Sequence, residues 1–493
     1  MRIPEKEGEY LRLVDQVIAQ GPYEATWESL AKAPVPDWFR REKLGIFIHW
    51  GVYSVPAKFN EWYSRNMYIQ GTDEFDHHVK TWGPHKDFGY KDFIPLFKAE
   101  RFDASSWMQL FQTAGAGYVL PVAEHHDGFQ MYDSELSDWN AANMGPSRDV
   151  MGDLRGEAEK LGLQFCCSTH RAEHWFFMGH GKEFDSDIKD PMVKGDFYWP
   201  AMPERDHFDQ FSTPAPDEEY LNDWLARTAE IIVKYQPRLL YFDWWIQHSV
   251  FKPYLKKLAA FYYNCGKLWG TDVLICYKHD AMMFGTGIVE VERGGLADAK
   301  PYPWQTDTAV ARNSWCYTDG LKYKSSNEVI ITLIDVVSKG GNLLLNIGPK
   351  ADGTIPAGDE KILRELGAWM RTNGEAIRSA KCWRFHSEGP TQAAEGQFQD
   401  AKEIPYTPQD YRFTTACGAV YAMCLKCPED GNFTVRSLAA CSDFQKPVFQ
   451  GILEKVEILG FDGEVSWHQD TNGLHLHADI HSDFPVTIKA TLA

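Results

Sequence analysis

Asp243 is the residue whose setting in the sequence points most directly to chemistry. It follows the apolar run Leu-Leu-Tyr-Phe at 239–242 and precedes Trp244. A carboxylate at the end of a buried strand is costly to desolvate unless it is paired or used. We therefore treat Asp243 as a candidate catalytic carboxylate, with an ion pair to a structural arginine as the alternative.

Two further carboxylates lie in the segment Val-Glu-Val-Glu-Arg-Gly at 289–294. Glu290 and Glu292 share one face of an extended chain, so at least one of them is expected to be solvated or ion-paired. Paired carboxylates among tryptophan and histidine side chains suit the hydrolysis of a glycosidic bond. In that reaction one carboxylate attacks the anomeric carbon, and the other acts first as acid and then as base.

Histidine, glutamate and tryptophan residues near the predicted strand ends could bind sugar hydroxyls and apolar sugar faces. His49, taken alone, is more often a hydrogen-bonded core residue. His125 and His126 could ligate a metal, but adjacent histidines point in different directions and no third ligand follows at a suitable spacing. We therefore expect no metal and no organic cofactor. The candidates for binding are His49, Glu61, Trp62, His125, His126, His170, Arg171 and Trp245.

The elements that would position these residues alternate between strands and helices. Continuous apolar runs, typical of parallel strands covered on both faces, occur at 44–50, 118–123, 163–168, 239–245, 273–277 and 343–347. Helical periodicity occurs at 220–235, at 329–338 behind a capping box of Ser325 and Glu328, and at 359–372. This alternation predicts a (β/α)8-like TIM barrel, in which functional side chains gather at the C-terminal ends of the strands.

The pattern changes near residue 385 to short alternating runs separated by turn signals such as Asp462-Gly and Asn472-Gly. Such a pattern predicts an antiparallel β-sandwich. We expect a catalytic barrel domain at 1–384 and a C-terminal β-sandwich domain at 385–493.

Composition excludes several classes of partner. The 493 residues include 69 acidic and 50 basic side chains, a formal net charge of −19, which argues against nucleic acid and anionic membranes as partners. We find no apolar run of 18 residues and no signal-peptide pattern at the N-terminus, so we expect a cytoplasmic protein without membrane association. The ten scattered cysteines then indicate reduced thiols rather than a disulfide framework.

Six segments carry a resemblance to a known family. They are Lys-Leu-Gly-Ile-Phe-Ile-His-Trp-Gly at 43–51, Asn-Glu-Trp-Tyr at 60–63, the segment 117–129 ending Ala-Glu-His-His-Asp-Gly-Phe, Pro-Arg-Leu-Leu-Tyr-Phe-Asp at 237–243, Gly-Asn-Leu-Leu-Leu-Asn-Ile-Gly-Pro at 341–349 and Asn-Gly-Glu-Ala-Ile at 373–377. In this order the chain resembles the α-L-fucosidases of glycoside hydrolase family 29. The resemblance covers roughly residues 35 to 385, and the last 100 residues look like the family's C-terminal β-domain.

The resemblance implies a retaining exo-α-L-fucosidase that acts on fucosylated oligosaccharides or glycosides. Asp243 matches the nucleophile, and His49, Glu61, Trp62, His125 and His126 match fucose contacts. Glu292 is favoured as the acid/base because Val-Glu-Arg-Gly precedes Pro-Trp-Gln at 303–305, and Glu290 is the alternative. We expect the two carboxylates about 5–5.5 Å apart, and a homo-oligomer is expected for an enzyme of this kind.

The sequence departs from the family pattern at three places. Glu124 stands where the family has a lysine before the two histidines, and the tyrosine of the third strand is replaced near Cys166. We hypothesise that His170 or Arg171 supplies the lost contact. The family's arginine after the fifth strand has no clean counterpart in Lys-His-Asp at 278–280, where His279 is placed with the binding residues by position alone.

Two other functions stay open at this point. One is a retaining exo-glycosidase for α-L-galactosides, because an apolar pocket for the sugar's C6 cannot strongly reject one extra hydroxyl. The other is a non-catalytic fucose-binding barrel, which would be marked by a missing nucleophile or acid/base.

Overall fold

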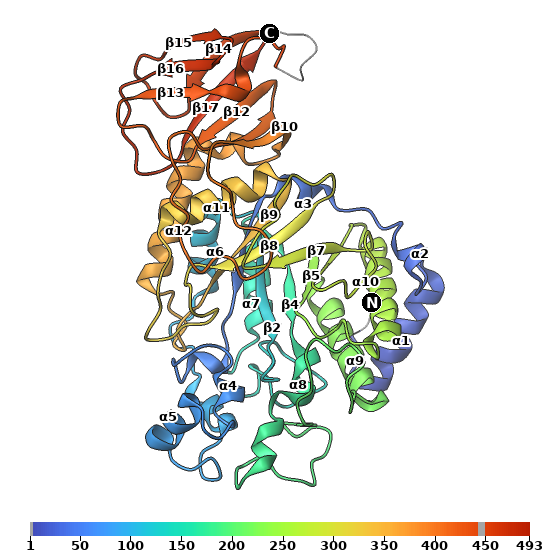
Figure 1. Cartoon of the computed structure of the whole chain (residues 1–493). Helices are drawn as coiled ribbons and strands as arrows, with labels where there is room; N and C mark the ends of the chain where they lie inside the picture. The colour runs from blue at the N-terminus through green and yellow to red at the C-terminus, as the bar shows by residue number, and fades with distance from the viewer. Residues whose placement is uncertain (1–2, 442–448) are drawn as a thin grey trace.

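Parallel strands close into a barrel in the computed structural model, which describes residues 3–441 and 449–493 (Figure 1). Their order around the barrel is β1-β9-β8-β7-β6-β5-β4-β2, and β1 also pairs with β2. The third strand is split, so that β3 and β4 both pair with β2. The predicted eight-stranded barrel is confirmed. The strands are β1 Leu44–Ile48, β2 Tyr118–Glu124, β3 Gln164–Phe165, β4 Cys167–Thr169, β5 Leu239–Phe242, β6 Leu274–Tyr277, β7 Ile288–Glu292, β8 Trp304–Ala309 and β9 Gly341–Ile347.

Helices cover the outside of the barrel. α11 begins at the capping serine Ser325, whose hydroxyl accepts a hydrogen bond from the amide of Glu328 at 3.0 Å, as the capping box predicts. The connections 278–287 and 293–303, which are described throughout, contain no helix. The α-helices are α1 Glu7–Gln20, α2 Trp27–Leu30, α3 Asp37–Arg41, α4 Tyr63–Asn66, α5 Asp73–Trp82, α6 Ala104–Ala114, α7 Val150–Lys160, α8 Arg171–Phe177, α9 Glu218–Tyr235, α10 Phe251–Trp269, α11 Ser326–Ser338 and α12 Ala357–Asn373. Short 3-10 helices are η1 Val52–Ser54, η2 Tyr90–Leu96, η3 Gly179–Glu183, η4 Gly374–Ala376 and η5 Arg436–Leu438.

Alternation along the strands decides which side chains fill the barrel. Successive side chains point to opposite faces of a strand. In β6, Leu274 and Cys276 belong to a buried cluster with Tyr241 of β5 and Ile288 of β7, whereas Ile275 packs into the larger core with the helices. The same alternation, continued past the strand ends, selects the side chains that reach the mouth of the barrel.

Two antiparallel sheets follow the barrel and share one apolar core, as predicted for a β-sandwich. Figure 1 shows them beyond α11, away from α1, α9 and α10. The first strand of the larger sheet begins at Lys381, so the boundary predicted at 384/385 falls within it. The larger sheet has the order β10-β11-β12-β17-β14 and the smaller one β13-β16-β15. Their bounds are β10 Lys381–Glu388, β11 Tyr411–Ala416, β12 Ala419–Cys424, β13 Asn432–Val435, β14 Leu453–Ile458, β15 Ser466–Asp470, β16 Gly473–His477 and β17 Val486–Leu492.

A buried ion cluster joins the sandwich to the barrel. Arg412 of β11 donates from Nε to Asp335 of α11 at 2.5 Å, and Lys339 donates to the other oxygen of Asp335 at 2.7 Å. Both cations are almost fully buried. Among the residues 3–441 and 449–493, no helix has the length and apolar character needed to cross a membrane.

Candidate active site

A cavity of about 380 Å³ opens at the C-terminal ends of the barrel strands. Eight of the residues predicted from the sequence line it: His49, Glu61, Trp62, His125, His126, His170, Asp243 and Glu292. Nine further lining residues were not predicted: Phe47, Asn60, Asn66, Tyr241, Trp244, Lys278, Asp307, Trp315 and Phe398.

Asp243, directly after β5, is surrounded by donors. Its Oδ1 accepts from Lys278 Nζ at 3.0 Å, its Oδ2 accepts from His170 Nδ1 at 3.0 Å, and His126 Nε2 lies 3.4 Å from Oδ2. Burial alone would raise the pKa of this carboxyl, but Lys278 and His170 hold it well below its ordinary value. Asp243 is therefore an ionised, oriented carboxylate at neutral pH.

Lys278, directly after β6, connects the two candidate catalytic carboxylates. Its side chain is 2% exposed, and Nζ donates to Glu292 Oε2 at 2.8 Å as well as to Asp243. Because one ammonium nitrogen contacts both carboxylates, at 3.0 and 2.8 Å, the two oxygens cannot be more than 5.8 Å apart, the sum of those distances. Asp307 of β8 lies 3.6 Å from the same nitrogen.

Glu292, the last residue of β7, has an environment that favours its protonated form. Burial raises its pKa to about 7; Lys278 opposes this shift, and the negative charges of Asp307 and Asp243 add to it. At neutral pH Asp243 is thus ionised, whereas a large fraction of Glu292 is protonated. Such a separation is the arrangement that acid/base chemistry by two carboxylates requires.

Glu290 lies deeper in the barrel than Glu292 and does not line the cavity. Its Oε2 accepts from Cys276 Sγ and from Gln305 Nε2, both at 2.9 Å. Burial and the nearby Asp307 raise its pKa well above the ordinary value. Glu290 is therefore a buried, neutral structural residue. Both glutamates lie on the same face of the strand, so they differ only in their depth in the barrel.

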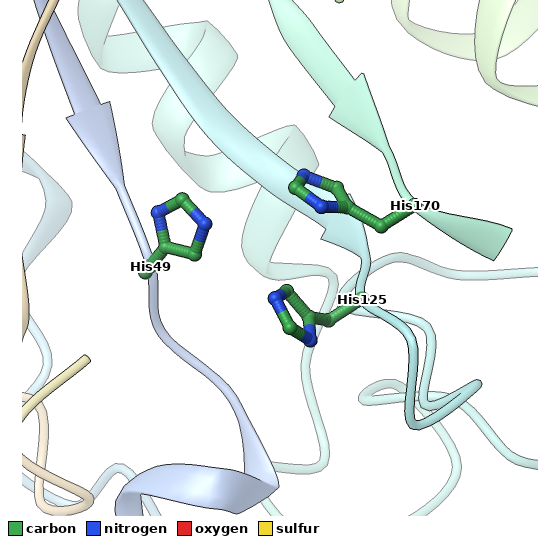
Figure 2. Close-up of side chains that lie close together, drawn as sticks. All are labelled: His49, His125 and His170. Carbon is green, nitrogen blue, oxygen red and sulfur yellow. The ribbon is translucent and has the colours of Figure 1, made fainter. Parts of the chain in front are cut away.

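Three histidines converge in the cavity, and one of them, His170, is hydrogen-bonded to Asp243. Figure 2 shows His49, after β1, His125, after β2, and His170, after β4, with their rings close together. One nitrogen of each lies within 4.8 Å of the others, so the set could ligate a metal ion. However, both ring nitrogens of His170 are already engaged, with Asp243 and with Ser168 Oγ, each at 3.0 Å.

The charge states of these rings suit binding to hydroxyl groups. Burial lowers the pKa of His49 and His125 well below the ordinary value and that of His170 to about 4, so all three are neutral at pH 7. A neutral imidazole offers one donor and one acceptor, the pattern that a hydroxyl matches. His49 Nδ1 and Asn346 Oδ1 are hydrogen-bonded at 2.6 Å, and His125 Nδ1 has no partner.

His126 differs from the other three because it keeps its proton. Burial would lower its pKa, but Glu173 and Asp243 raise it to about 9. Its ring lies 5.8 Å from that of Trp62, which together with Trp244 provides aromatic surface on the cavity wall. A cationic His126 adds to the positive charge that Lys278 places beside Asp243.

Glu61 and Trp315 form the remaining wall. Glu61 Oε2 accepts from the backbone amide of Trp315 at 3.0 Å, which ties the loop after β1 to the loop after β8. The Trp315 ring stacks on His49 with centroids 5.3 Å apart. Glu61 is 6% exposed and lines the cavity, where its carboxylate could accept hydrogen bonds from a sugar.

Three residues predicted as substrate contacts lie outside the cavity. Arg171 is held in ion pairs, NH1 to Glu124 at 2.6 Å and NH2 to Asp223 at 2.7 Å. This pairing accounts for the acidic residue before the two histidines, and of the two residues proposed to replace the missing tyrosine only His170 reaches the cavity. Trp245 is 1% exposed and packs on Trp175, Phe176 and His248 in the core.

His279 is the third predicted contact that the structure places elsewhere. It adopts a left-handed backbone conformation with φ of 51°, and its ring lies beside Trp244 at 5.9 Å, outside the cavity lining. The preceding residue, Lys278, occupies the position that had been assigned to His279. The alternation of β6 provides the signal, since positions 274 and 276 face the barrel interior and 278 continues that series.

Comparisons with known proteins agree with one another. A family model described as Alpha-L-fucosidase matches residues 11–375. Tissue alpha-L-fucosidase of Rattus norvegicus is 30% identical over 470 residues, covering 92% of this chain and 87% of the rat protein. Plasma alpha-L-fucosidase of Homo sapiens is 32% identical over 390 residues, covering 75% and 74%.

Solved structures give the same result. The crystal structure of Thermotoga maritima alpha-fucosidase matches with a TM-score of 0.74 and 27% identity, covering 95% of this chain and 100% of the other. The same protein in complex with a mechanism based inhibitor and in complex with fucose matches with a TM-score of 0.74 and 28% identity, at the same coverage.

Proposed function

The chain belongs to the alpha-L-fucosidase family, and from its cavity we propose that it hydrolyses α-L-fucosides with retention of configuration, Asp243 acting as nucleophile and Glu292 as acid/base. The family fixes the class of reaction, a glycoside hydrolysis. We assign the nucleophilic attack to Asp243 and the two proton transfers to Glu292. The substrates proposed are fucosylated oligosaccharides or glycosides that present a terminal α-L-fucose.

One observation carries the mechanism: the shared contact of Asp243 and Glu292 with Lys278. It limits the separation of their oxygens to 5.8 Å. Retaining enzymes hold the two carboxyl groups about 5–5.5 Å apart, whereas inverting enzymes need about 6.5–9.5 Å to fit a water between carboxylate and sugar. The spacing therefore supports direct attack by a carboxylate.

In the first step, a carboxylate oxygen of Asp243 attacks the anomeric carbon of fucose and the glycosidic C–O bond breaks. Glu292 gives its proton to the departing oxygen, so the leaving group is a neutral alcohol and Glu292 becomes a carboxylate. In the second step, Glu292 takes a proton from water as that water attacks the anomeric carbon. Asp243 is released, and both residues return to their starting protonation states.

The surrounding charges fit both steps. Lys278 and His126 stabilise the ionised Asp243 before attack and when it is released. When Glu292 has lost its proton, the same Lys278 contact at 2.8 Å stabilises the resulting carboxylate. Neutral His49 and His125 are placed to exchange hydrogen bonds with the hydroxyls of the sugar.

The test is hydrolysis of p-nitrophenyl α-L-fucoside by the wild type and by Asp243→Ala, with Glu290→Gln as a matched carboxylate control. We expect the wild type and the control to be active and Asp243→Ala to be slower by several orders of magnitude. Equal rates for the wild type and Asp243→Ala would show that Asp243 is structural.

Azide then separates the two roles by stereochemistry. With Asp243→Ala, azide replaces the nucleophile in a single displacement and gives the β-fucosyl azide. With Glu292→Ala, azide attacks the covalent fucosyl-enzyme and gives the α-fucosyl azide. Proton NMR of the anomeric centre distinguishes the products. Formation of the α-azide by Asp243→Ala would contradict the assignment.

A further inference from the structure

We infer that the strap, defined as residues 394–400 between β10 and β11, forms the leaving-group side of the active site, and that Phe398 is a platform for the sugar ring released on hydrolysis. The inference rests on the proposed role of Glu292. It gives the C-terminal part of the chain a part in substrate selection, because the strap follows the first strand of the sandwich.

The strap is hydrogen-bonded along the chain that carries the proposed acid/base. The amide of Phe398 donates to the carbonyl of Glu292 at 2.9 Å, and the amide of Gln399 donates to the carbonyl of Arg293 at 2.7 Å. Gly295 and Gly396 exchange two further backbone hydrogen bonds at 3.2 and 2.9 Å. The end of β7 and the strap are thus joined by a short ladder of backbone hydrogen bonds.

Gly294 allows this close approach. A Cβ placed on Gly294 would lie 1.8 Å from the carbonyl oxygen of Gly396, so no residue with a side chain fits there without moving the strap. The glycine that ends the Val-Glu-Val-Glu-Arg-Gly segment is therefore explained by packing against the strap.

Asp400 anchors the far end of the strap to the barrel. Its Oδ2 accepts from Lys324 Nζ at 2.6 Å, from Thr308 Oγ1 at 2.5 Å and from Arg293 NH1 at 3.2 Å. Lys324 is 4% exposed, and Thr308 belongs to β8. Charge-assisted hydrogen bonds to several partners hold the strap in one place.

Phe398 is held in an unusual state by these contacts. It has a φ of 56°, in the left-handed region that non-glycine residues rarely adopt, and it is 57% exposed although it lines the cavity. An observed backbone outlier at the mouth of a site is a reason to look for function. The exposed ring of Phe398, held at the mouth of the cavity, offers an apolar surface on which a ligand can pack.

The position of Phe398 identifies which part of the substrate covers it. The general acid must reach the glycosidic oxygen, so groups that border Glu292 toward the mouth face the leaving group. The histidines that suit fucose hydroxyls come from β1, β2 and β4, across the barrel from β7. A phenyl ring offers no hydrogen bonds, and it fits the apolar C–H face of a pyranose.

The test compares two substrates that need the same acid catalysis but differ in the leaving group. Methyl α-L-fucoside releases methanol, which has no ring, and an α-L-fucosyl disaccharide releases a pyranose. For Phe398→Ala we expect the ratio of kcat/KM for the disaccharide to that for the methyl fucoside to fall about tenfold, the value of one lost ring contact. Phe398→Tyr, which keeps the ring, is expected to keep the ratio, and so is Phe211→Ala, a control at a residue that is 75% exposed and outside the cavity lining.

Each outcome decides the question. An equal loss on both substrates would mean that Phe398 acts through the backbone of Glu292 and would overturn the platform. An unchanged ratio, or a wild type that cleaves the methyl fucoside and no disaccharide, would overturn it as well. A wild type that hydrolyses neither substrate refutes the proposed function itself, and the platform with it.

Discussion

Removal of the charge of Lys278 should shift both pH limits of activity to higher pH. Its ammonium contacts Asp243 at 3.0 Å and Glu292 at 2.8 Å, and it is buried. At an effective dielectric constant of about 20, a unit charge at that distance is worth about 5 kcal/mol, or roughly 4 pKa units. Water that enters the space left by Lys278→Met will reduce this value, so we expect a shift of at least about one unit.

The sign follows from what each carboxyl must do. Asp243 has to be ionised, so its pKa sets the acidic limit of kcat/KM, and Glu292 has to be protonated, so its pKa sets the basic limit. Lys278 lowers the pKa of both groups. Without it, the acidic limit should rise into the measurable range and the basic limit should rise above the value of about 7 for Glu292.

The assay is release of fucose from methyl α-L-fucoside, whose poor leaving group needs the acid, measured across the pH range in which the wild type is active. Lys278→Arg keeps the charge and is the matched control, with both limits expected near those of the wild type. If Lys278→Met lowers the rate equally at every pH, the residue acts only through packing. That result would refute the electrostatic role derived from its contacts.

Two further predictions concern buried ionisable side chains outside the cavity. Arg171→Met should lower the free energy of unfolding by about 3 kcal/mol, because Glu124 and Asp223 each lose an ion-pair partner, although Arg227 remains 3.0 Å from Asp223. Urea denaturation measures this change, and a loss below about 1 kcal/mol would contradict the prediction. Glu290→Gln should stabilise the protein more at pH 8 than at pH 5. Because the pKa of Glu290 is raised in the folded protein, the wild type loses stability as the pH rises above the ordinary pKa of glutamate, and glutamine has no proton to lose. Equal effects at both pH values would show that Glu290 is not protonated.

The two barrel strands that the sequence did not reveal, β7 and β8, carry Glu292 and Asp307 of the cavity. β5, with the sequence Leu-Leu-Tyr-Phe, and β9, with its central Leu-Leu-Leu, are largely apolar and were predicted as strands. β7, with the sequence Ile-Val-Glu-Val-Glu, and β8, with Trp-Gln-Thr-Asp-Thr-Ala, are buried but polar. Buried parallel strands are usually recognised by their apolar sequence, and this criterion fails where the inward-facing positions carry the polar side chains of a functional site.

Residues that line the cavity were predicted where one strand end supplied a distinctive pattern. Asp243 follows an apolar run, and His125-His126 is conspicuous in any sequence. Asp307 and Trp315 gave no local signal, because their roles depend on contacts with Lys278 and His49, which are far away in the chain. Phe398 lies in a segment between two sandwich strands, where nothing in the sequence indicates that the chain returns to the barrel.

The position of a residue along an inward-facing series explains what the sequence left open. Positions 274 and 276 of β6 face inward, and the next position of this series, just after the strand, is Lys278; this selects the lysine over the adjacent His279. In β7 the series 288, 290, 292 contains two glutamates, and alternation alone cannot choose between them. Depth decides, because two residues advance about 6.5 Å along the strand. Glu290 therefore meets Gln305 in the packed interior, and only Glu292 reaches the ammonium that also binds the nucleophile.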